Sequence, residues 1–134
     1  MNIASFDDLL RAAGDQEEPQ RLLFVFAAAG IADDATPAQR ERFETGRGGT
    51  LTPSMCVDKL LHEVATFEAL LEESRQFDQA WDIVFVAALS GAGGAPPTTE
   101  QAGTALQRMV DSIKSGRIGG FIPFDARGQA VQFG

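Results

Sequence analysis

The amino-acid sequence predicts a single α/β domain in which helices pack against a mixed β-sheet. Two runs, Leu22–Ala28 and Ile83–Leu89, are apolar on both alternating faces, which is typical of strands covered on both sides. Helical patterns separate these strands, so mainly right-handed crossovers are expected. A chain of 134 residues, 44% of them hydrophobic and 22% charged, suits one domain with its own core and is too apolar for disorder.

The chain is expected to begin with a short amphipathic helix, followed by the first buried strand. Ser5 is a capping residue, acidic residues follow it, and Gly14 favours the end of the helix. Apolar residues recur in this segment at helical spacing: Phe6, Leu9, Leu10 and Ala13. Leu22–Ala28 then forms a central strand, which requires one layer above it and one below.

A small exposed helix and a peripheral strand are expected next. Thr36 caps the helix, Pro37 occupies its first position, and Gly46 ends it. Thr50–Val57 is predicted to be a strand. Because Pro53 cannot donate to a ladder, this strand is expected at an edge of the sheet or at a bulge.

Two longer helices are predicted in the second half of the chain. The first begins at Asp58 as its cap, and its apolar residues recur at steps of three and four: Leu60, Leu61, Val64, Phe67, Leu70 and Leu71. After the strand Ile83–Leu89, a capping box at Thr98 and Gln101 begins the last helix, which Gly116 ends.

The C-terminal segment is predicted to be a β-hairpin. Ile118–Phe124 and Gln129–Phe133 are its strands, and Asp125–Gly128 is a type I turn with Asp and Gly at its ends. Pro123 favours a peripheral position. The predicted order is therefore helix, strand, short helix, strand, helix, strand, helix, strand, strand.

Charge and cysteine content narrow the classes of function. A formal net charge of -8 repels a phosphate backbone, which disfavours nucleic-acid binding. The longest apolar runs fall short of the roughly 20 residues that cross a bilayer, so no membrane-spanning helix is expected. No basic region precedes an apolar one near Met1, so no export is expected. Cys56 is the single cysteine, which fits a reducing compartment such as the cytoplasm, and no cofactor is predicted.

Several segments resemble a group of short bacterial proteins, and the similarity spans nearly the full chain. These segments are Arg21–Ala29, Leu51–Lys59, Leu71–Arg75, Trp81–Leu89 and Arg117–Phe121. Proteins of this group often carry the label ribonucleotide reductase subunit alpha. The resemblance implies a bacterial protein and brings no catalytic or binding motif to this sequence. A reductase large subunit resembles a much longer barrel with a radical-bearing cysteine and a redox pair, which Cys56 alone cannot supply.

The sequence offers few candidate catalytic groups. His62 is the nearest partner for Cys56, but one Cys and one His are the minimum for thiol catalysis and not a signature. Cys56 lies in an apolar stretch, where free cysteine is commonly buried and inert, so we expect it to be dispensable. A zinc site lacks the usual ligands. Asp7-Asp8 and Glu72-Glu73 are interpreted as capping and solvated residues.

The glycine-rich segment after the second buried strand is the best candidate for ligand binding. In open α/β sheets a crevice forms beyond the carboxyl ends of the strands. There the loops Gly30–Thr36 and Ser90–Thr98 would meet and present Asp33, Asp34, Ser90, Gly91, Gly93, Gly94 and Thr98. The segment matches neither the dinucleotide fingerprint nor a P-loop, and Asp33 and Asp34 of the other loop favour a neutral or cationic ligand over phosphate.

Two hypotheses for function remain. The first is a non-catalytic cytoplasmic module for protein interaction or regulation, because active-site motifs are missing and edge strands can pair with another chain. The second is a protein or enzyme that binds a small molecule or nucleotide-related ligand at the two loops. A thermal-shift panel of metabolites would separate them, since a specific ligand stabilises the folded state. The partner is left open: another protein, a small molecule or a second copy of the chain.

Overall fold

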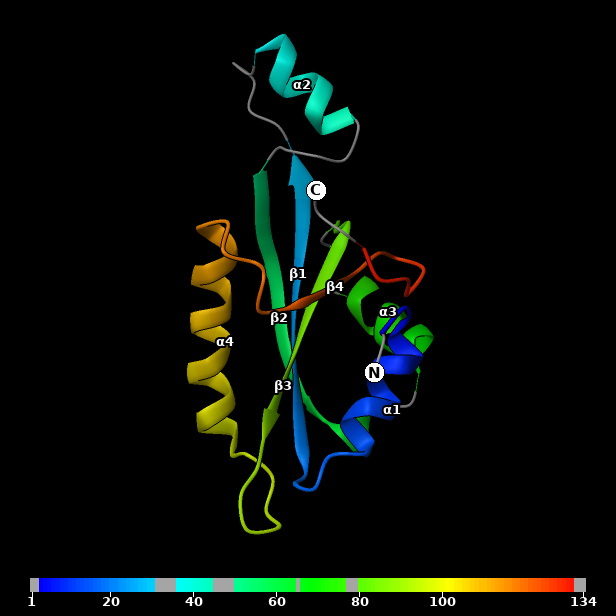
Figure 1. Cartoon of the computed structure of the whole chain (residues 1–134), viewed down its shortest axis with the longest axis vertical. Coiled ribbons are helices and arrows are strands. Elements are labelled where there is room, and N and C mark those ends of the chain that lie inside the picture. Colours follow the sequence, from blue (N-terminus) through cyan, green and yellow to red (C-terminus); the bar gives the residue numbers. More distant parts are fainter. Residues whose placement is uncertain (1–2, 31–35, 45–49, 65, 77–79, 132–134) are drawn as a thin grey trace.

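The computed structural model of the chain describes residues 3–30, 36–44, 50–64, 66–76 and 80–131. Its elements, in chain order, are α1 (Phe6–Gly14), β1 (Gln20–Gly30), α2 (Pro37–Glu44), β2 (Thr50–Leu60), the 3-10 turn η1 (Leu61–Glu63), α3 (Phe67–Arg75), β3 (Ile83–Ser90), α4 (Thr99–Lys114) and β4 (Ile122–Phe124). They form three layers, with α4 on one face of the sheet and α1 and α3 on the other (Figure 1).

The sheet has the strand order β2-β1-β3-β4, and every pairing among these strands is antiparallel. The two apolar runs are the central strands β1 and β3, as the sequence predicts. The prediction of a mixed sheet with right-handed crossovers is wrong, because β2 and β3 both run antiparallel to β1. Helix α2 lies beyond the ends of β1 and β2 rather than over the sheet (Figure 1), so it joins two neighbouring strands without a crossover.

Each face of the sheet has its own hydrophobic core, because successive residues of a strand point to opposite faces. The core on the side of α1 and α3 contains Phe6, Leu9, Ala13, Leu22, Phe24, Phe26, Val64, Phe67, Leu70, Val84, Val86 and Phe124. The core on the α4 side contains Leu23, Val25, Ala27, Ile83, Phe85, Ala102, Leu106, Met109 and Ile113. Residues 22–27 of β1 and 83–86 of β3 are all apolar because they are buried on both sides.

Strand β2 is longer than predicted, and the helix after it begins later. Asp58, expected to be a helix cap, pairs with Leu23 of β1, and the ladder continues to Leu60. Helix α3 begins after Thr66, whose Oγ1 accepts a hydrogen bond from the N–H of Ala69 at 3.1 Å. The helix start was misplaced because Leu60 continues the apolar spacing of α3 backwards into a strand.

Cap residues mark the starts of α1 and α4 as predicted. Ser5 and Asp8 exchange side-chain hydrogen bonds with each other's backbone N–H at the start of α1. The N–H of Ala4 also donates to Asp8, and this bond holds the pKa of that carboxyl below its ordinary value. Thr98 and Gln101 make the same reciprocal pair at the start of α4.

Glycine is a less reliable signal for the helix ends. Gly116 has a φ of +79° and follows Ser115, the C-cap of α4, as predicted. Gly14 is instead the last residue of α1, and Asp15 closes the helix with a φ of -84°, so no left-handed residue is needed. Gly46 lies outside the described residues.

The predicted C-terminal hairpin is reduced to β4 and isolated bridges. The strand expected over residues 118–124 is limited to the three residues of β4. A 3.0 Å backbone hydrogen bond closes the turn at 125–128. After it, Gln129 bridges to Ser5, and the N–H of Ala130 donates to the carbonyl of Ala4. Residues 129–131 also pair with the β4 segment, because the N–H of Asp125 donates to the Gln129 carbonyl and the N–H of Val131 donates to the Pro123 carbonyl, both at 3.0 Å. The short second strand of the hairpin thus lies between β4 and the N-terminal segment.

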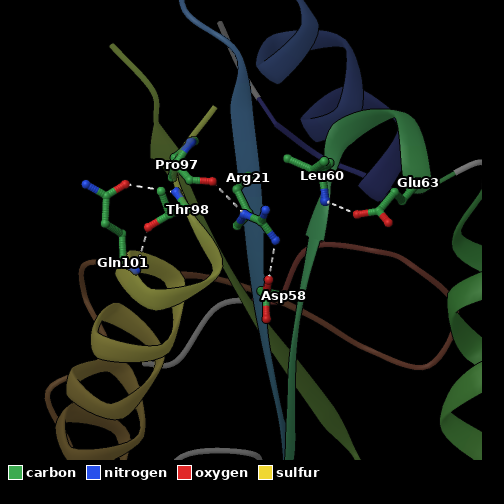
Figure 2. Close-up of polar contacts among 7 residues, drawn as sticks. All are labelled: Arg21, Asp58, Leu60, Glu63, Pro97, Thr98 and Gln101. Carbon is green, nitrogen blue, oxygen red and sulfur yellow. Dashed lines mark hydrogen bonds and ion pairs between the residues drawn. The ribbon is translucent and has the colours of Figure 1, made fainter. Parts of the chain in front are cut away.

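An ion pair joins three elements near the start of β1. The Arg21 guanidinium contacts the Asp58 carboxylate through Nη1 at 2.5 Å and donates through Nε to the Pro97 carbonyl at 3.0 Å (Figure 2). The side chains of Arg21 and Asp58 are only 12% and 22% exposed. This pair therefore holds β2 against β1 and positions the segment that leads into α4.

Candidate functional site

Gly30 and the 90–98 loop, which were expected to contribute to one ligand site, lie at opposite ends of β1. Gln20 at the start of β1 pairs with Ser90 at the end of β3, because the strands are antiparallel. The 90–98 loop therefore lies beside the start of β1, whereas Gly30 is at its other end. The parallel strands assumed for a shared crevice are therefore not present, because β1 and β3 are antiparallel. Asp33 and Asp34 lie outside the described residues.

The polar groups of the 90–98 loop are already engaged within the protein. The Ser90 hydroxyl accepts a hydrogen bond from Gln20 Nε2 at 2.9 Å, and the Gly94 N–H donates to Glu18 at 2.8 Å. Gly93 and Gly94 have φ of +61° and +81°, which explains glycine at both positions. Thr98 caps α4. These residues build a tight turn and a helix start.

Gly91 has a steric role in this turn. A Cβ built on it would lie 1.9 Å from the carbonyl oxygen of Ala95, whereas a Cβ on Gly103 in α4 meets nothing within 4 Å. We expect Gly91→Ala to lower the free energy of unfolding by about 1–3 kcal/mol. Gly103→Ala should raise it by about 0.5–1 kcal/mol, because alanine is the better helix former. Urea denaturation of both variants checks this, and equal midpoints would contradict the steric role.

Cys56 and His62 are not arranged as a catalytic pair. Cys56 is exposed in β2, which corrects the expectation that it is buried. His62 is exposed in η1, and the two residues line different pockets. Among the described residues, no group of three or more His, Cys, Asp or Glu side chains could hold a metal ion.

The backbone of β1 shows which groups of β2 face away from the sheet. In a strand, the N–H and C=O groups of successive residues point alternately to the two sides. The Ala27 carbonyl accepts from the N–H of Asp82 at 2.9 Å, on the β3 side. The Phe26 carbonyl accepts from Ser54 Oγ at 3.2 Å, on the β2 side. The backbone N–H and C=O groups of Phe24, two residues earlier, therefore also point towards β2.

The free edge of β2 follows from this alternation. Val57 pairs with Phe24, so its polar backbone groups face β1. Those of its neighbours Cys56 and Asp58 consequently point away from the sheet. Because β2 is the terminal strand of the described sheet, no strand is present on that side to receive them. We call the segment Cys56–Asp58 the open window of β2.

Both ends of the open window are blocked. Pro53 pairs with Ala27, whose backbone polar groups point to β3, so the backbone of Pro53 points away from the sheet. Proline has no N–H to donate to an added strand. A register shift beside it marks the bulge expected from the sequence. At the other end, the outward N–H of Leu60 donates to the carboxylate of Glu63 at 2.7 Å (Figure 2). The strand therefore offers a short edge of defined length.

A pocket of about 340 Å³ opens beside the open window, between β2 and α3. It is lined by Phe26, Ser54, Met55, Cys56, Val57, Leu70, Glu73 and Ser74. Half of these residues have apolar side chains, and two serine residues, Cys56 and one carboxylate complete the lining. A pocket of this composition can take an apolar side chain whose backbone lies along β2.

Polar contacts and an aromatic pair fix α3 beside this pocket. Lys59 of β2 forms an ion pair with Glu73 of α3 at 2.9 Å. The buried hydroxyl of Ser74 accepts a hydrogen bond from the indole N–H of Trp81 at 3.0 Å. The Trp81 ring meets Phe26 edge-on, with centroids 5.1 Å apart. These contacts hold the helix at a set distance from the strand, so the pocket is preformed.

Compared with protein-family models, curated proteins and solved structures, the chain has no significant match. No helix within the described ranges is both long and apolar enough to cross a membrane. The site is therefore interpreted from its own geometry.

Sequence reasoning identified the strand that carries this site but not the site itself. Pro53 placed β2 at an edge or bulge, which the sheet order confirms. The pocket was missed because Asp58 was assigned to the start of a helix, which separated Val57 from α3. Leu70 and Glu73 were interpreted only as the buried and solvated positions of that helix.

Proposed function

We propose that this protein is a non-catalytic interaction module that binds an extended segment of another protein by strand addition to β2. The observation that carries the proposal is the open window of β2, where unpaired backbone groups lie beside a preformed, partly apolar pocket. Strand addition uses these two elements together: main-chain hydrogen bonds provide affinity, and pockets for alternate side chains provide specificity.

The geometry sets how such a segment would bind. Cys56 and Asp58 each offer one N–H and one C=O group to an added strand. The residue of the added segment that lies opposite Val57 points to the same face as Val57, which packs on the core beside α3. Its side chain therefore enters the pocket, while its two neighbours form the main-chain hydrogen bonds.

A pair of substitutions at Cys56 tests the proposal. Proline at this position removes one outward N–H without removing a hydrogen bond to β1, because proline is tolerated where its nitrogen faces solvent at an edge. We expect Cys56→Pro to weaken binding about tenfold, the effect of one lost hydrogen bond. Cys56→Ser keeps the N–H and should bind as the unchanged protein does, because the side chain of Cys56 points to the face of the sheet opposite to that of Val57.

The ligands for this test come from a display library of short random peptides selected on the unchanged protein. Each selected peptide is then titrated against both Cys56 variants by fluorescence anisotropy, after circular dichroism has shown that both variants are folded. Equal affinities for the proline and serine variants would contradict the proposal. A selection that yields no binding peptide would contradict it as well.

A further inference from the structure

We infer that the segment bound at β2 carries a Lys or Arg immediately before an apolar anchor residue. This inference rests on the proposed function and names the chemistry of its partner. It comes from the register that strand addition imposes and from the charge of the groups around the open window.

The register places one residue of the partner opposite Asp58. Antiparallel pairing is the more stable arrangement, and in it the partner residue opposite Asp58 comes directly before the residue opposite Val57. The residue opposite Val57 is the anchor. The pair at Val57 has no hydrogen bonds to the added strand, so its side chains approach closely, which favours contact between the anchor and the pocket.

Asp58 has an oxygen available for a cation. Its Oδ2 atom contacts Arg21, and no group within the described ranges donates to Oδ1. Opposite charges in directly opposed positions of neighbouring strands stabilise the pairing. A Lys or Arg in the partner, opposite Asp58, can therefore form an ion pair with the Oδ1 atom of this carboxylate.

The wider surroundings are also acidic. From β2 to the end of α3, the acidic residues are Asp58, Glu63, Glu68, Glu72 and Glu73, against the basic residues Lys59 and Arg75. Acidic residues remain in excess when Arg21 of β1, which contacts Asp58, is included. The whole chain carries a formal net charge of -8. Such a field accelerates the approach of a basic segment and disfavours an acidic one.

A second copy of the chain suits this edge less well than a basic segment. Two copies that pair through β2 would bring two molecules of charge -8 together and place both Asp58 residues in one short ladder. Like charges in neighbouring strands destabilise the pairing. The partner is therefore an extended segment of a different, basic protein region.

Matched blocked peptides test the inference on the unchanged protein. They share one extended sequence and differ only in the residue before a central leucine, which is Lys, Gln or Glu. We expect the Lys peptide to bind about tenfold more tightly than the Glu peptide at low ionic strength, with a smaller ratio in high salt. Replacing the central leucine by alanine should weaken binding about tenfold.

Two aspartate variants locate the effect. Asp58→Asn should reduce the preference for the Lys peptide, whereas Asp7→Asn in α1, which changes the net charge equally, should keep it.

If Cys56→Pro weakens peptide binding but the peptides show no charge preference, the inference fails and the proposed function stands. If no peptide binds, or if Cys56→Pro binds each peptide as tightly as the unchanged protein does, the proposed function itself fails. A dimer in solution that Cys56→Pro dissociates would show that a second copy occupies the edge and overturn the inference.

Discussion

Replacing Phe6 by alanine is expected to lower the free energy of unfolding by about 3–5 kcal/mol, the range for deleting a buried aromatic ring. Phe6 is 1% exposed. Its ring centroid lies 6.1 Å from that of Phe24, 5.2 Å from that of Phe67 and 5.6 Å from that of Phe124. One side chain of α1 therefore contacts a central strand, α3 and β4, and no single neighbour can fill the space that it leaves.

Urea denaturation followed by the fluorescence of Trp81 measures this effect. Leu10→Ala, in the same helix, is a suitable control because Leu10 is only partly buried and packs at the margin of the same core. The control should lose clearly less stability. Equal losses for the two variants would show that Phe6 is not the residue that anchors α1.

Replacing Arg21 by methionine is expected to lower the free energy of unfolding by about 2–4 kcal/mol, because it leaves a largely buried carboxylate without its partner. The change also removes the donor to the Pro97 carbonyl and so releases the segment before α4. The partial exposure of Arg21 and Asp58 keeps the expected loss below that of a fully buried pair.

A double substitution separates the ion pair from the packing of the site. Arg21→Met combined with Asp58→Leu removes both charges, and much of the stability should return, since an apolar pair of similar volume commonly replaces a buried ion pair without loss. Urea denaturation of the unchanged protein, the two single variants and the double variant gives a double-mutant cycle for the interaction of Arg21 with Asp58. A double variant that is less stable than Arg21→Met would contradict this account.

The elements that depend on local signals could be predicted from the sequence. The burial of β1 and β3 follows from their apolar runs, and the starts of α1 and α4 follow from Ser5 and Thr98. Strand direction could not be predicted, because a helix between two strands fits either a crossover or a longer connection between antiparallel neighbours. Thr66, the cap of α3, was overlooked because the apolar spacing continued before it.

The site depends on information that no local pattern contains. Pro53 indicated an edge strand, and from it an interaction through that edge was hypothesised. Which of its residues face outward depends on the register with β1, and the contact between Glu63 and the Leu60 N–H depends on the turn that follows. The residues of the loop site were combined on an assumed parallel strand direction, whereas β1 and β3 are antiparallel.

Hydrogen exchange of the backbone amides in β2 tests the central claim most directly. In the free protein, the amides of Cys56 and Asp58 should exchange rapidly, whereas that of Val57, which bonds to β1, should be protected. Saturation with the Lys–Leu peptide should slow exchange at Cys56 and Asp58 and leave the amides of α4 unchanged. Rapid exchange at both positions in the saturated complex would contradict strand addition at β2.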